Sequence, residues 1–253
     1  MNAHSNHTRS LLIKVLPIFI VVLAALMLSA RPAFAQGTTC TVTTTDDSGP
    51  GTLRQCVASV DSGGIIDFNL SIPGTITLTT GEIVISKTLT IAGPGWESLT
   101  VSGNNAGRIF NITSTVALTD VVTISGLTLR DGSVLNGDGG AIVTYQPLNL
   151  TGVTISNSTA QGYTGSPTPG PGGGVGGAIA AFAPLTVTAS SIYSNTAVDT
   201  GSDAGDQGGD GGGIAAFDAL AVISSVLTGN TANGDDLGGG AILASGPTTV
   251  ISG

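Results

Sequence analysis

The residues of this chain that could do chemistry are mostly acids. Asp203, Asp206 and Asp210 lie in the run Asp-Ala-Gly-Asp-Gln-Gly-Gly-Asp, and glycine-aspartate alternation can wrap calcium through carboxylate and backbone oxygens. Calcium-binding solenoids repeat such a motif many times, whereas this chain shows it once. We therefore expect no cofactor. The three aspartates are the one calcium candidate, and a solvated loop is the alternative interpretation.

A second chemistry open to acids is glycoside hydrolysis, which needs two carboxylates facing each other across a sugar. Most aspartates here fall in glycine-rich connections instead of on strands that would hold a pair rigidly. Both histidines, His4 and His7, precede the cleavage site expected below. We expect no catalytic residue, and a carbohydrate-active enzyme (polysaccharide lyase or glycoside hydrolase) remains the alternative function.

Charge narrows the choice of partners. The chain has 253 residues, with 7 basic and 16 acidic side chains, and a formal net charge of −9. Such a surface repels phosphate backbones and anionic lipid heads. We therefore expect no nucleic-acid partner.

The first 35 residues follow the three-part pattern of a secretory signal peptide. Arg9 and Lys14 precede an apolar run over 15–28, and small residues end the segment at 33–35. This predicts cleavage between Ala35 and Gln36, with an uncleaved membrane anchor as the alternative. The mature protein is then secreted or at the cell surface, with the outer membrane as one such location.

Export also bears on the two cysteines, Cys40 and Cys56. An even pair in an oxidising compartment more often forms a disulfide than stays free. Apolar residues recur at helical spacing from Leu53 to Val60, after Thr52 and Gln55 at capping-box spacing. We predict a capping segment over 36–64, in which a short helix covers one end of the fold.

Short strands follow over 65–253. Triads of the form apolar-Thr-apolar recur along this stretch, and Gly, Asn, Ser and Pro separate them. Each triad has the period-two pattern of a half-buried strand. An antiparallel sandwich would also show short strands and glycine turns, so the decisive feature is a long-range repeat.

That repeat consists of a glycine pair, an isoleucine and, farther on, an asparagine. Stacked coils would align the isoleucines in an inward ladder and the asparagines in an amide ladder. The variable connections, 161–175, 198–210 and 233–238, would then lie along one edge. The repeat residues are Gly139, Gly140, Ile142 and Asn157; Gly176, Gly177, Ile179 and Asn195; Gly211, Gly212, Ile214 and Asn230; and Gly239, Gly240 and Ile242.

These repeats resemble those of the polymorphic outer-membrane protein family, and the segments 47–55 and 89–95 are similar to exported bacterial β-helix repeat proteins. The resemblance covers nearly all of residues 40–253. It implies a right-handed, single-stranded parallel β-helix on the bacterial surface. The family has phenylalanine three residues before the asparagine, where this chain has Thr154, Ile192 and Leu227.

The resemblance also implies a structural or adhesive role. We therefore expect an exported β-solenoid whose loops on one edge bind an extracellular glycan or protein. The sequence stops inside a strand pattern after Gly240, from which we expect a truncated C-terminal end. Membrane contact would then occur only through the signal peptide or a missing C-terminal anchor.

Overall fold

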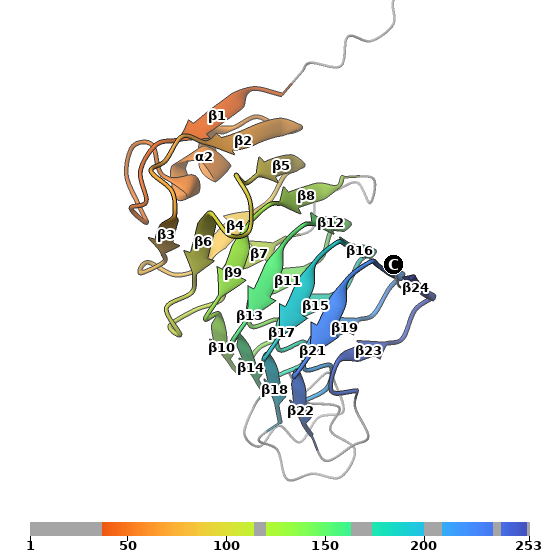
Figure 1. The fold of residues 1–253 in the computed structure, drawn as a ribbon. Helices are drawn as coiled ribbons and strands as arrows, with labels where there is room; N and C mark the ends of the chain where they lie inside the picture. Colours follow the sequence, from red (N-terminus) through yellow and green to blue (C-terminus); the bar gives the residue numbers. More distant parts are fainter. Residues whose placement is uncertain (1–36, 114–119, 163–173, 200–208, 235–238, 252–253) are drawn as a thin grey trace, which may run out of the picture. The chain divides into compact units, whose positions relative to one another are not determined.

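In the computed structural model, residues 37–113, 120–162, 174–199, 209–234 and 239–251 are described. They form short parallel strands that wind into successive coils, and each coil adds a strand to sheets running along the stack (Figure 1). The described part holds four all-parallel sheets and one helix. The predicted parallel β-helix is confirmed.

We name the sheets A to D. Sheet A comprises β1 (Thr39–Val42), β2 (Gly64–Phe68), β5 (Leu89–Ala92), β8 (Val122–Ser125), β12 (Leu148–Thr151), β16 (Leu185–Thr188), β20 (Leu220–Ile223) and β24 (Thr248–Ile251). Sheet B comprises β3 (Gly74–Thr77), β6 (Leu99–Ser102), β9 (Thr128–Arg130), β13 (Thr154–Ser156), β17 (Ser191–Tyr193) and β21 (Val226–Thr228). Sheet C comprises β4 (Ile83–Ile85), β7 (Phe110–Ile112), β11 (Ile142–Thr144), β15 (Ile179–Ala181), β19 (Ile214–Ala216) and β23 (Ile242–Ala244). Sheet D comprises β10 (Ser133–Leu135), β14 (Thr159–Gln161), β18 (Thr196–Val198) and β22 (Thr231–Asn233).

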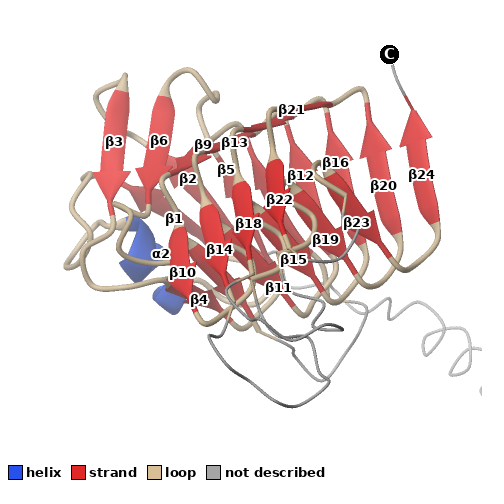
Figure 2. Cartoon of the chain, turned by 90° about the horizontal axis from the view of Figure 1, so that it is seen from below, coloured by secondary structure: helices blue, strands red, loops and turns tan. Residues whose placement is uncertain are grey.

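The helix α2 (Leu53–Ser59) begins at a polar cap. The Thr52 hydroxyl accepts a hydrogen bond from the Gln55 amide at 3.2 Å, and Gln55 Oε1 accepts one from the Gly51 amide at 2.6 Å. The buried residues Leu53, Cys56 and Val57 form its apolar face. This face packs near β1, β2 and β4, so the helix covers the core beside the first coils (Figure 2).

The core is built from aligned apolar side chains. Ile142 pairs in register with Ile179, Ile179 with Ile214, and Ile214 with Ile242. On the other side, Ile142 pairs with Phe110. Each inward side chain is therefore covered by the coils before and after it, and Ile142, Ile179 and Ile214 have no exposed surface. Burying such a side chain contributes about 1.5–3 kcal/mol.

Aromatic residues stack in the same manner just after sheet C. Tyr145, Phe182 and Phe217 each follow the ladder isoleucine of their coil by three residues. The ring centroids of Tyr145 and Phe182 lie 5.0 Å apart, those of Phe182 and Phe217 lie 4.9 Å apart, and the rings are nearly parallel. Like residues thus lie above one another outside the core as well, at the spacing of neighbouring strands.

The amide hydrogen bonds between neighbouring coils show that one predicted repeat residue, Asn157, was assigned to the wrong position. Asn195 Nδ2 donates to Asn230 Oδ1 at 2.9 Å, but Asn195 Oδ1 accepts from the Ser158 amide, also at 2.9 Å. Ser158, and not Asn157, therefore occupies the ladder position, as the register of Thr159 with Thr196 requires.

Asn157 lies one residue earlier, outside the ladder, and is exposed. Its φ is +53°, and the equivalent Ser194 and Gly229 have φ of +54° and +61°. Asparagine tolerates this left-handed turn conformation because its short polar side chain bonds locally. With this shift the position three before the ladder residue is Ile155 and not Thr154. Ile155 pairs with Ile192, so both coils have isoleucine where the family has phenylalanine.

We predict that Asn195→Ala lowers the free energy of unfolding by about 2 kcal/mol, because buried partners lose their hydrogen bonds. Asn195 is fully buried and bonds to Ser158, Asn230 and the Ile155 carbonyl. The matched control is Asn157→Gly, which should stay within about 1 kcal/mol of wild type, since glycine suits the left-handed turn. Urea denaturation measures both. A larger loss for the Asn157 variant would contradict the corrected register.

Candidate functional site

A polar cluster lies where three successive coils enter sheet C. Glu82 directly precedes β4, Arg108 precedes β7, and Asp138 precedes β11. Arg108 Nη1 forms an ion pair with Glu82 Oε2. Its Nε donates to the carbonyls of Asp138 at 3.1 Å and Gly139 at 2.9 Å, and Nη2 donates to the Asp138 carbonyl at 2.8 Å. The arginine therefore ties three coils together.

Both oxygens of Glu82 have partners. Oε2 accepts from Arg108, and Oε1 accepts from Asn111 Nδ2 at 2.6 Å. The opposite atom of that amide, Asn111 Oδ1, is buried without a hydrogen-bond partner among the described residues. Side-chain exposure is 12% for Arg108 and 28% for Glu82, so the carboxylate is the more accessible member of the pair.

Asp138 is the buried acid of this cluster, and burial affects its pKa. Burial raises the pKa of the Asp138 carboxyl above its ordinary value, although the Val175 amide, which donates to Oδ1 at 3.2 Å, and the Arg108 charge favour the ionised form. A raised pKa in the folded state means that this group adds stability as the pH falls through that pKa. Above that pKa, the ionised form of Asp138 opposes folding.

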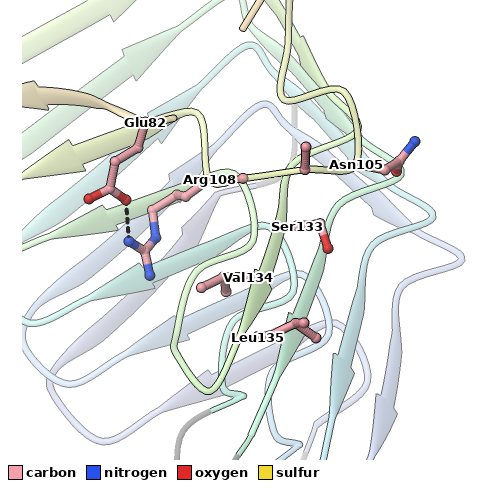
Figure 3. A pocket seen from close by; sticks show the side chains of 8 residues that line it. Glu82, Asn105, Arg108, Ser133, Val134 and Leu135 are labelled. Atoms are coloured by element: carbon pink, nitrogen blue, oxygen red, sulfur yellow. Dashed lines mark hydrogen bonds and ion pairs between the residues drawn. The ribbon is translucent and has the colours of Figure 1, made fainter. Parts of the chain in front are cut away.

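A pocket of about 350 Å³ opens next to this cluster (Figure 3). Glu82 and Arg108 lie at one side, and Ser133, Val134 and Leu135 of β10 form another wall. Asn105, Ala106 and Gly107 complete the lining. The pocket thus combines an ion pair, a hydroxyl and an amide with two aliphatic side chains, which suits binding of a partly polar ligand.

A second ionic cluster fixes the helix α2 to the first coil. Arg54 Nη2 pairs with Asp47 Oδ1 at 2.7 Å and also donates to the Gly81 carbonyl at 2.6 Å. Asp47 Oδ2 accepts from both the amide and the hydroxyl of Thr79 and of Thr80, at 2.7–3.1 Å. Burial opposes ionisation of Asp47, but these donors and the guanidinium outweigh it and hold the pKa of Asp47 well below its ordinary value.

The lowered pKa of Asp47 predicts acid sensitivity. Its stabilising contribution is complete above the unfolded pKa of about 4 and is lost as the pH falls below that value. We expect Asp47→Asn to lower the free energy of unfolding at pH 7 by about 2 kcal/mol and to flatten the pH dependence below about pH 4. Thermal melts from pH 7 to pH 3 measure this. If the melting temperature of Asp47→Asn fell as steeply below about pH 4 as that of wild type, other carboxyls would govern acid unfolding.

The other predicted site residues are placed as follows. Cys40 and Cys56 form a disulfide with a Cα–Cα distance of 5.5 Å. Asp210 is buried and its carbonyl accepts from the Gly176 amide, whereas Asp203 and Asp206 lie outside the described residues. The signal-cleavage residues Ala35 and Gln36 and most of the predicted loops also lie outside them.

Within the described ranges, no group of three or more His, Cys, Asp or Glu side chains is arranged to hold a metal ion. Across the same ranges, no helix has the length and apolar character needed to cross a bilayer.

Sequence reasoning missed both ion pairs of Arg108 and Arg54. A further ion pair joins the chain neighbours Arg130 and Asp131, with 3.3 Å between Nη1 and Oδ2. Glu82 and Arg108 are 26 residues apart in the chain, about one coil. A search for opposite charges one coil apart would have found this pair, because stacked coils place such residues side by side.

Comparison with known proteins gives one distant relative. Outer membrane protein B of Rickettsia rickettsii is 29% identical over 132 residues, which is 51% of this chain and 8% of that protein. The chain therefore matches only a small part of the relative's length. No protein-family model matches the chain, and no solved structure does. The chain is a parallel β-helix with distant similarity to an outer membrane protein.

Proposed function

We propose that this protein is an exported, surface-exposed β-helix that serves as an adhesive binding scaffold. The similarity to an outer membrane protein supports surface exposure. The predicted signal peptide over 1–35 and the resemblance of the repeats to polymorphic outer-membrane proteins point in the same direction. The binding role is the part that experiments must establish.

One observation carries the adhesive role. The strands β14, β18 and β22 end in register at Gln161, Val198 and Asn233. The connections that vary in length begin directly after these residues. They therefore leave the fold from one column of sheet D, and a rigid stack that presents variable loops along one edge is a common basis for binding surfaces.

The ion pairs formed by three of the acidic side chains favour a binding role over the enzyme alternative. Asp47, Glu82 and Asp131 all form ion pairs with arginines. A glycosidase needs one carboxyl that holds a transferable proton and a second that is free to attack or to activate water. Glu82 instead has both oxygens engaged by Arg108 and Asn111, which is the arrangement of a structural cluster.

The proposal is tested with the purified chain immobilised on beads. Adhesion to arrays of extracellular-matrix proteins and surface glycans is measured for wild type and for a variant in which a glycine-serine linker replaces 163–173. We expect the variant to lose adhesion and to keep its circular dichroism spectrum. A matched control replaces the exposed Trp96 by alanine, away from sheet D, and should adhere as wild type does.

The enzyme alternative is tested on the same preparation. Polysaccharide turnover that disappears in Glu82→Gln or Asp138→Asn, with adhesion unaffected by the linker, would overturn the scaffold proposal.

A further inference from the structure

Sheet D has an open edge at its first strand. Its order is β10-β14-β18-β22, so β10 pairs with β14 on one side. Within the described residues, no strand of the preceding coil pairs with β10 on its other side. The preceding coil instead contributes the turn 104–107, whose last carbonyl, that of Gly107, accepts from the Ser133 amide at 3.0 Å.

The register decides which backbone groups of β10 face this open side. The Thr159 amide donates to the Gly132 carbonyl, so Gly132 and, two residues on, Val134 direct their backbone groups toward β14. Ser133 and Leu135 alternate with them and direct theirs away from β14. The bond from the Ser133 amide to Gly107 agrees with this direction. The Ser133 carbonyl and both backbone groups of Leu135 therefore face the open edge.

The pocket described above lies along the open edge of β10. The pocket of about 350 Å³ is lined by all three residues of β10 and by the turn residues of the preceding coil. Leu135 as a whole residue is 68% exposed, which is unusual for a large aliphatic residue. An unpaired strand edge beside a groove with exposed apolar surface is the arrangement that takes up an extended peptide as an added strand.

We propose that an extended, basic peptide segment of a partner protein binds here by pairing with β10. The proposal rests on the chain being a binding scaffold, as proposed above, and adds a partner class and a second surface, the open edge of β10. Main-chain hydrogen bonds would go to Ser133 and Leu135, and an aliphatic side chain of the peptide would cover Val134 and Leu135. The net charge of −9 on the chain favours lysine or arginine side chains in the peptide.

The probe is an acetylated, amidated peptide of alternating valine and lysine, titrated into the full chain by calorimetry. We expect it to bind wild type. Leu135→Pro removes the outward amide but no hydrogen bond of the sheet, since the Leu135 amide faces away from β14. This variant should fold and bind roughly tenfold more weakly. Leu135→Ala keeps the backbone donor and should retain most of the affinity.

Hydrogen exchange gives a readout that needs no partner. In the free chain the Leu135 amide should exchange faster than the Val134 amide, and the peptide should protect it. A Leu135 amide already protected in the free chain, or equal affinity of wild type and a folded Leu135→Pro variant, would overturn the proposal. The same peptide N-methylated at every amide should not bind, because a strand directs alternate amides to opposite edges and both edges are then blocked. Undiminished binding of this peptide would contradict strand pairing.

These outcomes are separable from those of the proposed function. Adhesion that depends on the 163–173 connection while the peptide fails to bind would overturn strand addition alone. Peptide binding without any adhesion would sustain strand addition and overturn the adhesive role.

Discussion

Replacing Gly177 by alanine is expected to lower the free energy of unfolding by about 3 kcal/mol or more. A Cβ at this position would overlap the Gly212 carbonyl oxygen of the next coil and would lie 2.5 Å from the Thr196 carbonyl carbon. Both obstacles are backbone atoms, so no side-chain rotation relieves them. The coils would have to separate where their hydrogen bonds hold them together, and chemical denaturation measures the cost.

The matched control is Gly107→Ala. A Cβ there meets nothing closer than the Gly81 Cα at 3.9 Å, so the change should stay within about 0.5 kcal/mol. Comparing Gly177→Ala with Gly107→Ala separates the cost of a clash between the backbones of neighbouring coils from the general effect of replacing a glycine. Equal stability of the two variants would show that the glycine pairs are not required for coil-to-coil contact.

Removing the disulfide between Cys40 and Cys56 is expected to cost about 3 kcal/mol, because the bond closes a loop of 16 residues in the unfolded chain. The bond joins β1 to α2, and both elements belong to the first coils. We expect the double variant Cys40→Ser, Cys56→Ser to show a lower melting temperature, with amides around β1 and α2 losing exchange protection first.

Reducing agent is the internal control for this prediction. The chain has only these two cysteines, so dithiothreitol should destabilise wild type to the level of the double variant and leave the variant unchanged. Wild type that melts at the same temperature with and without dithiothreitol would show that the hydrophobic contacts of Leu53 and Val57 hold the helix by themselves.

Local patterns were enough to predict the strands and their stacking. Apolar-Thr-apolar triads place two side chains inward, and copies such as Ile142 and Ile179 pair in register because one coil can cover another only when their apolar positions coincide. Thr52 and Gln55 likewise predicted the start of α2, since a helix cap depends on residues three apart in the chain.

The asparagine ladder shows where such reasoning fails. Counting from the isoleucines allowed an offset of 15 or 16 residues, and Asn157 looked equivalent to Asn195 by residue type. The hydrogen bonds place Ser158 there instead. Residue identity was misleading because asparagine suits both a buried ladder and a left-handed turn, and only the register of the neighbouring coil separates the two roles.

The sequence by itself determined that the chain forms a stack of parallel coils and that two cysteines could pair, because these features depend on short-range periodicity and composition. Only the tertiary structure decided that Arg108 joins Glu82 and the Asp138 carbonyl, and that β10 has an open edge beside a pocket. Coils differ in length, so contacts between them depend on where each one turns. The position of each turn is fixed by packing against the preceding coil and not by any local sequence pattern.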